Sequence, residues 1–322
     1  MTILDRPPED TTGQPVDEPV GKLGDKIFFG LSFGAAALIM VTLAAVALFL
    51  FFEGLPTFTS DSGDLDGDGS FLSYVGPLVF GTIYISVIAL VLATPVAIAV
   101  ALYISHYAPR KLAQTLGYFI DLLAAIPSVV YGLWGITVLA PVMASSLFPW
   151  LRDNLGFIPL FGSDAAVSTS GRSTLTVGVV LAVMILPMIT AISREVFMQT
   201  PRLHEEASLA LGATRWEVIR QAVIPYGRSG VISGAMLGLG RALGETMAVA
   251  IILSPSKGYF WDILTNQNSN SIAANIALQF PESSGLEVNR LIATGLVLFV
   301  ITFGVNALAR RIVNSGFSGA DG

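Results

Sequence analysis

Residues 200–225 read TPRLHEEASLALGATRWEVIRQAVIP, the one long stretch in which charged residues interrupt an otherwise membrane-like chain. The pattern predicts two short helices joined by a turn. Thr200 is expected to cap the first helix, with Pro201 at the first helical position, where the N–H that proline lacks would have no partner in any case. Apolar residues recur at helical spacing on both helices, and charged residues occupy the other faces. The stretch therefore predicts a charged helix hairpin outside the apolar spans.

The turn and the end of this hairpin carry specific signals. Gly212 suits the left-handed backbone conformation that ends a helix. Thr214 and Glu217 have the three-residue spacing of a capping box at the start of the second helix. Pro225 is expected to stop that helix. Taken alone, these signals are also compatible with an ordinary hairpin lying on a membrane surface.

The composition is that of an integral membrane protein. Of the 322 residues, 53% are hydrophobic and 12% are charged, whereas soluble domains carry about 25% charged residues. The chain has no cysteine, which excludes disulfides and thiolate metal sites. Its net charge of −6 gives no sign of a nucleic-acid-binding surface. No G-x-x-x-x-G-K-[ST] phosphate loop occurs, so ATP-driven work would need a separate subunit.

Six apolar segments predict six transmembrane helices in an all-α integral membrane protein, because a hydrocarbon layer about 30 Å thick needs about 20 helical residues. The predicted spans are 27–52, 71–105, 112–140, 173–193, 229–254 and 291–309. The expected organisation is a cytoplasmic tail at 1–26, a first span with an acidic outer loop at 27–70, a membrane core at 71–311 and a tail at 312–322. Residues 141–172 are expected to form an outer loop.

Lysine and arginine placement predicts the topology, because cytoplasmic loops carry the excess of positive charge. Of the 17 basic residues, those in outer segments are Arg152, Arg172, Lys257 and Arg290. All the others except Arg241 fall on the side of residues 200–225, so the hairpin and both termini are expected to be cytoplasmic. In the outer loop, residues 61–70 mimic the opening of a calcium loop, but Val75 stands where the twelfth-position glutamate would be. A solvated acidic turn is favoured over a metal site.

Arg241 lies inside the predicted span 229–254. A guanidinium at mid-membrane costs about 2.5–3.5 kcal/mol on insertion scales, so its side chain should face protein or water. Glu245 follows at i+4 in the string GLGRALGETMA, and on a continuous helix its carboxylate would lie one turn away on the same face. The guanidinium suits a phosphate oxyanion. Two interpretations stay open: an anion pathway in which the anion replaces the carboxylate, or a structural ion pair that bridges to a neighbouring helix.

Glycines and a proline predict how the spans pack. Small-residue faces are expected on the span 229–254, one with Gly230, Gly234 and Gly238 and another with Gly240 and Gly244. In the string AAIPSVVYGLWG, residues 124–135, Pro127 should bend the span, and Gly132 and Gly135 should allow close packing. Asp121 is expected either to face the pathway or to pair with Arg110 or Lys111.

Residues 200–225 resemble the EAA loop of ABC-importer permeases, the cytoplasmic segment that docks on the ATPase subunit. Ser208 replaces the second alanine of that motif, and Ala222 stands where an isoleucine is usual. The resemblance implies that the residues coupling this chain to an ATPase are Glu206, Ala207, Gly212, Ala213 and Pro225.

With AAIPSVVYGLWG and GLGRALGETMA, this loop makes residues 71–311 similar to the phosphate-uptake permeases of the Pst system, of the PstC rather than the PstA type. The resemblance implies a type I ABC importer (MetI-like) permease fold with six spans in the bacterial cytoplasmic membrane. It implies a PstA-like second permease subunit, a PstB-like ATPase dimer that holds ATP and magnesium, and a PstS-like extracytoplasmic phosphate-binding protein. This chain itself would hold no cofactor. Arg241 and Glu245 match residues implicated in phosphate passage.

Other substrates and other mechanisms are alternatives. Sulfate and molybdate permeases share the EAA loop, and it is the string around Arg241 and Glu245 that favours phosphate. A gradient-driven anion transporter would need no ATPase and would show inverted internal repeats, of which the sequence gives no clear sign. The buried charge disfavours a purely structural membrane subunit. The sequence therefore predicts a permease subunit, not an enzyme, that forms half of a translocation pathway.

Overall fold

The computed structural model describes residues 22–59, 70–162, 165–254 and 256–317. Within these ranges the chain is helical and forms no strand beyond an isolated bridge between Val167 and Thr265. The α-helices are α1 (Lys22–Thr59), α2 (Phe71–Leu102), α3 (Arg110–Ala124), α4 (Ser128–Trp134), α5 (Ala140–Val142), α6 (Phe148–Leu155), α7 (Thr174–Met198), α8 (Arg202–Ala210), α9 (Arg215–Val218), α10 (Ile224–Leu243), α11 (Met247–Ile252), α12 (Ile272–Gln279) and α13 (Leu286–Phe317). Four π-helical turns connect some of them: η1 (Tyr103–Tyr107), η2 (Gly135–Leu139), η3 (Met143–Leu147) and η4 (Ile219–Val223).

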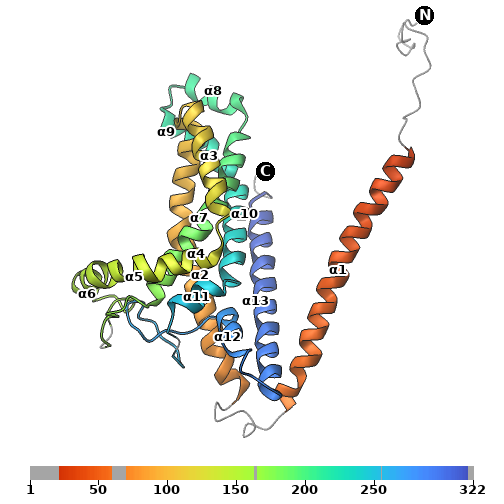
Figure 1. The fold of residues 1–322 in the computed structure, drawn as a ribbon. Coiled ribbons are helices and arrows are strands. Elements are labelled where there is room, and N and C mark those ends of the chain that lie inside the picture. The colour runs from red at the N-terminus through yellow and green to blue at the C-terminus, as the bar shows by residue number, and fades with distance from the viewer. Residues whose placement is uncertain (1–21, 60–69, 163–164, 255, 318–322) are drawn as a thin grey trace, which may run out of the picture. The chain divides into compact units, whose positions relative to one another are not determined.

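The chain divides into two units, residues 1–49 and 50–322. The first unit contains most of α1, whose apolar side chains are exposed around the whole helix. A helix that is apolar on every side is typical of a membrane span. In the second unit, α8 and α9 lie at one end, and α6 and α12 lie at the other (Figure 1).

The core of the second unit is the contact between α2 and α7. Alanines four residues apart line one face of α2 and are almost completely buried, namely Ala89, Ala93, Ala97 and Ala101. Because alanine has a small side chain, α7 can approach α2 closely. Branched residues of α7, including Val180, Leu181 and Ile185, are buried in the same core cluster as these alanines.

Helix α10 also packs against α7 through glycine, as the sequence predicts. A Cβ added at Gly238 would lie 3.0 Å from Cδ1 of Ile189, and one added at Gly230 would clash with Val196. The second predicted small-residue face, with Gly240 and Gly244, meets no other helix of the described chain.

In the part of the chain that the structure describes, five helices are long and apolar enough to cross a membrane. They are Gly24–Phe58, Phe71–Tyr107, Ser128–Leu155, Thr174–Met198 and Leu286–Leu308. Residues 229–254 are not among the described candidates, because glycine and arginine lower the hydropathy of α10 and the helix ends at Leu243. A count of six spans therefore stays a prediction.

The predicted boundaries of the span 112–140 are wrong. Helix α3 ends at Ala124, and Pro127 caps a new helix whose apolar run continues to Leu155. Proline disfavours helical geometry in the residue before it, so the helix is interrupted at Ile126. The predicted loop 141–172 is helical as far as Leu155, because its prolines occupy the first turns of α5 and α6, where no N–H is required.

The end of the unit that carries α6 and α12 is covered by hydrogen-bonded loops. Nη2 of Arg152 in α6 lies 2.8 Å from a carboxylate oxygen of Asp262. The side-chain oxygen of Asn268 accepts hydrogen bonds from the backbone N–H and the hydroxyl of Thr174, at 2.9 and 3.0 Å. These polar contacts attach the segment 256–271 to α6 and to the start of α7.

Replacing Gly81 by alanine is expected to destabilise the protein by about 1–3 kcal/mol, the usual cost of overpacking. A Cβ at Gly81 would clash with the backbone carbonyl of Asn270, which a rotamer change cannot relieve. The apparent midpoint of thermal unfolding in detergent should fall by at least about 2 °C. Gly304→Ala is the matched control, because Gly304 lies in α13 with no atom within 4 Å of an added Cβ. Equal midpoints for the two variants would contradict the close contact.

Candidate functional site

The helix that carries Arg241 is broken directly after it. Helix α10 ends at Leu243, and α11 begins only at Met247. The predicted continuous helix, with Arg241 and Glu245 one turn apart on the same face, is therefore wrong. Gly244 makes the break inexpensive, because it has no side chain to bury and leaves helical geometry easily.

Glu245 supplies a hydrogen-bond acceptor to the backbone at this break. Its side chain is only 8% exposed, and its Oε1 accepts a hydrogen bond from the backbone N–H of Ala248 at 3.1 Å. That N–H belongs to the first turn of α11, where backbone donors have no helical partner. The expected ion pair with Arg241 does not form in the described chain. Glu245 instead supports the start of α11.

Arg172 supports the other end of α11. Its Nε donates to the carbonyl of Ile252 at 3.1 Å, and its Nη2 lies 3.3 Å from the carbonyl oxygens of Ile251 and Leu253. The short helix is thus held by a carboxylate at its positive end and a guanidinium at its negative end, which matches the helix dipole. The sequence reasoning missed this role and placed Arg172 in an outer loop, because those carbonyls lie about 80 residues further along the chain.

Arg241 itself is half-buried and, within the described residues, has no hydrogen-bond or ion-pair partner. It is close enough to Tyr131 of α4 for its charge to act on the phenol. The hydroxyl of Tyr131 is already used, since it donates to the carbonyl of Leu123 at 2.8 Å. The arrangement leaves a guanidinium with its donors available, which is what an anion needs.

The close packing predicted for Gly132 and Gly135 is confirmed next to Tyr131. A Cβ added at Gly132 would lie 3.0 Å from Cα of Ala248, and one added at Gly135 would lie 2.6 Å from Cγ2 of Val180. Helix α4 therefore contacts α11 almost backbone to backbone. This contact fixes α11 from the side, while Glu245 and Arg172 hold its ends.

The hairpin at residues 200–225 has the predicted turn. Gly212 has a φ of +88°, and Thr214 forms the predicted capping box with Glu217. The backbone N–H of Thr214 and then its hydroxyl hydrogen-bond to the exposed Glu217 carboxylate and lower its pKa. The stabilisation from this box is present above the ordinary pKa of glutamate and is lost as the pH falls through the lowered one.

Both predicted ends of the hairpin need correction. Thr200 is not the cap: its hydroxyl is buried without a hydrogen-bond partner among the described residues, and Pro201 precedes the first residue of α8. Pro225 does not stop the second helix. The π turn η4 carries the chain into α10, and the N–H of Ile224 bonds to the carbonyl of Ile219, five residues back. Pro225 then falls in the first turn of α10, where proline is tolerated.

The hairpin packs on the membrane-spanning helices through α9 and η4. Most of its remaining surface is exposed. Ile219 and Val223 are buried against Phe197 of α7. In contrast, Leu211 is 90% exposed, and Leu203 and Trp216 are also exposed. Of the predicted coupling residues, Ala213 is half-buried, and those exposed are Glu206, Ala207, Gly212 and Pro225. Exposed apolar side chains beyond the spans are typical of a protein interface.

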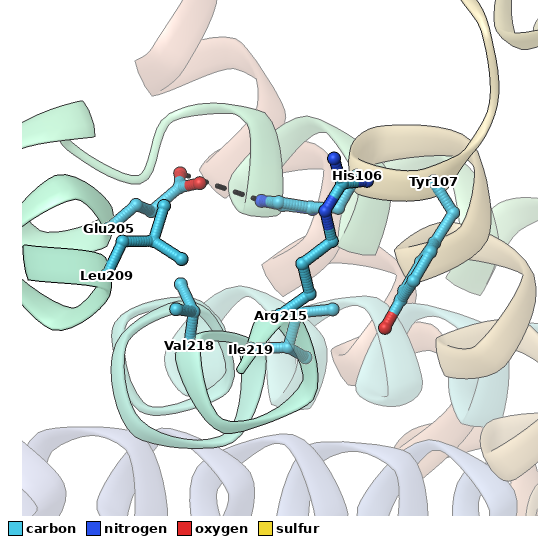
Figure 2. Close-up of a pocket in the computed structure, with 7 residues that line it drawn as sticks. All are labelled: His106, Tyr107, Glu205, Leu209, Arg215, Val218 and Ile219. Carbon is cyan, nitrogen blue, oxygen red and sulfur yellow. Dashed lines mark ion pairs between the residues drawn. The ribbon is translucent and has the colours of Figure 1, made fainter. Parts of the chain in front are cut away.

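A cavity of about 260 Å³ lies between the hairpin and the end of α2. Figure 2 shows the residues that line it: His106, Tyr107, Glu205, Leu209, Arg215, Val218 and Ile219. Across it, Nε2 of His106 lies 3.7 Å from Oε1 of Glu205. This ion pair joins η1, which continues from α2, to α8.

Two other predicted features are resolved only in part. Asp121 is exposed on α3 and forms no ion pair with Arg110 or Lys111 in the described chain. No group of three histidine or acidic residues suited to a metal ion occurs among the described residues. The acidic turn at 61–70 lies outside the described residues except for Ser70.

Comparisons with known proteins agree on one family. Residues 93–315 match the family described as "Binding-protein-dependent transport system inner membrane component". The chain is 43% identical over 314 residues to "Phosphate transport system permease protein PstC 2" of Mycobacterium tuberculosis, covering 94% of this chain and 96% of that protein. It is 44% identical over 235 residues to the PstC protein of Xylella fastidiosa, covering 73% and 72%.

Two solved structures share the fold. A bacterial ABC transporter involved in the import of the acidic polysaccharide alginate matches with a TM-score of 0.55 and 16% identity, covering 89% of this chain and 99% of that one. The MetNI methionine ABC transporter, in an inward-facing conformation, matches with a TM-score of 0.50 and 15% identity, covering 74% and 95%. At these identities the likeness concerns the fold alone.

Proposed function

Because this chain belongs to the family of binding-protein-dependent transport system inner membrane components and has the fold of type I ABC-importer permeases, we propose that it is the permease subunit of an ATP-driven phosphate importer. The identity to PstC proteins over nearly the whole chain supports phosphate as the substrate. The protein is a multi-pass membrane permease and not an enzyme. ATP hydrolysis takes place on a separate subunit, which holds the nucleotide and magnesium, so this chain needs no cofactor.

The observation that carries the substrate assignment is the half-buried guanidinium of Arg241, which no carboxylate of the described chain neutralises. A guanidinium presents a fork of N–H donors that fits phosphate oxygens. Phosphate must also leave again, so the site has to bind it weakly. Glu245 serves the same pathway by supporting α11, and its negative charge limits how tightly an anion is held.

The hairpin is the coupling segment. Leu203, Leu211 and Trp216 offer an apolar surface outside the spans, and the residues proposed to couple to the ATPase are Glu206, Ala207, Gly212, Ala213 and Pro225. The partners are a second, PstA-like permease subunit, a PstB-like ATPase dimer and a PstS-like extracytoplasmic binding protein. The hairpin and both termini face the cytoplasm of a bacterial cell, and the loops at the end of α6 and α12 face the binding protein.

Phosphate uptake by reconstituted vesicles tests this function. Vesicles that contain both permeases and the ATPase, with the binding protein added outside, should accumulate labelled phosphate when ATP is enclosed. Omission of ATP, the ATPase or the binding protein should abolish accumulation. Excess sulfate or molybdate should not compete; competition by either would assign the other oxyanion. Uptake by this chain alone along an ion gradient would contradict the proposal.

A further inference from the structure

Helix α8 is weakly held by packing. None of its side chains is buried, and only Glu205 and Ser208 are even half-buried. Apolar contact therefore contributes little to its position relative to the membrane spans. Glu205 faces the body of the protein, and its carboxylate points across the cavity toward His106 (Figure 2). The two side chains retain 28% and 15% exposure, so water screens their interaction only in part.

His106 belongs to the π turn η1, which continues directly from α2. The buried alanines of α2 pack against α7, so η1 is attached to the buried core of the unit. A contact between His106 and Glu205 therefore joins the hairpin to the core without passing through α9 or α10. Such a contact provides a second route for movement from the hairpin to the spans.

The hydrogen bonds around His106 indicate which form of the imidazole makes this contact. The hydroxyl of Ser105 lies 2.8 Å from the carbonyl oxygen of Ala101 and 2.7 Å from Nδ1 of His106. A hydroxyl has one hydrogen to donate. When Ser105 donates it to Ala101, Nδ1 must itself carry a hydrogen and donate to the Ser105 oxygen. A neutral imidazole then has a bare Nε2 facing the Glu205 carboxylate, whereas the doubly protonated ring has a donor at both positions.

We propose that His106 is a positioning residue that, as the imidazolium, ties the coupling helix α8 to α2 through Glu205. The tie transmits movement of the hairpin to the membrane spans. This inference rests on the proposed function, because it assumes that residues 200–225 receive movement from the ATPase.

The charges in the cavity set the sign of its pH dependence. Among the residues that line it, Glu205 of α8 favours the imidazolium and Arg215 of α9 opposes it; Tyr107 of η1 is the remaining titratable group, and the other lining residues are apolar. Because the tie needs the protonated ring, acid pH favours it over alkaline pH.

The test is the number of phosphate ions imported per ATP hydrolysed by the reconstituted importer. The variants His106→Ala, His106→Gln and Glu205→Ala should lower this ratio about threefold to fivefold at pH 6.0, the effect of an ion pair worth up to about 1 kcal/mol. In the unaltered protein the ratio should fall between pH 6.0 and pH 8.0. His106→Lys, which stays charged, should keep the acid-pH ratio at both values. Combining His106→Ala with Glu205→Ala should add no further loss.

His204→Ala is the matched control, because His204, the other histidine of the chain, lies exposed on α8 next to Glu205. It should leave the ratio and its pH profile unchanged. The proposal is overturned if His106→Gln behaves as the unaltered protein does at both pH values, since glutamine keeps a polar amide but not the charge. Absence of ATP-driven phosphate uptake by the unaltered importer is a different result, and it would refute the proposed function instead.

Discussion

Replacing Arg241 by alanine is expected to lower ATP-driven phosphate uptake by about 30-fold or more. Removing one partner of a buried, charge-assisted contact costs about 2–5 kcal/mol, and each 1.4 kcal/mol corresponds to a factor of ten. The guanidinium has no other partner in the described chain, so its loss should leave the protein intact and remove only the contact with the anion. Labelled phosphate uptake by the reconstituted importer measures the effect.

Two further variants separate charge, geometry and helix support at this site. Arg241→Lys keeps the charge but loses the fork of donors, so uptake should lie between those of the unaltered protein and the alanine variant. Glu245→Gln keeps an oxygen that can accept from Ala248, so α11 should remain capped. Basal ATP hydrolysis and subunit assembly should be unchanged in Arg241→Ala. Full uptake by that variant would show that the anion does not pass Arg241.

Replacing Gly212 by valine is expected to uncouple ATP hydrolysis from uptake. At its φ of +88°, a residue with a side chain raises the conformational free energy of the turn by roughly 1–2 kcal/mol, and a β-branched residue raises it further. The turn should therefore change shape, and α8 should lose its orientation toward the ATPase. Hydrolysis should continue while uptake falls by about tenfold, which corresponds to roughly 1.4 kcal/mol.

The matched control at this turn is Gly212→Asn. Asparagine tolerates left-handed geometry better than other side chains, and an added Cβ meets no atom within 4 Å. Most of the coupling should therefore survive in the asparagine variant. An unaltered ratio of phosphate to ATP in Gly212→Val would contradict the role of this turn.

The sequence alone determined the fold class and the local turn and capping motifs of the hairpin. The left-handed glycine at 212 and the capping box at Thr214 depend on residues within four positions of one another, so a linear pattern is sufficient to predict them. The close packing at Gly132 and Gly238 was predictable for the same reason, because small residues at fixed spacing leave a helix one flat face. Arg241 stood out because a charge within an apolar span is costly.

Only the tertiary structure decided how the charged residues are used. Arg241 and Glu245 are neighbours in sequence, yet the break at Gly244 assigns the carboxylate to α11 and leaves the guanidinium open. Arg172 finds its acceptors about 80 residues away, and His106 meets Glu205 across a cavity. A linear pattern reports periodicity and the cost of burying a charge, but a hydrogen bond or an ion pair needs two atoms within about 3–4 Å of each other. Which atoms reach that distance depends on how the whole bundle packs.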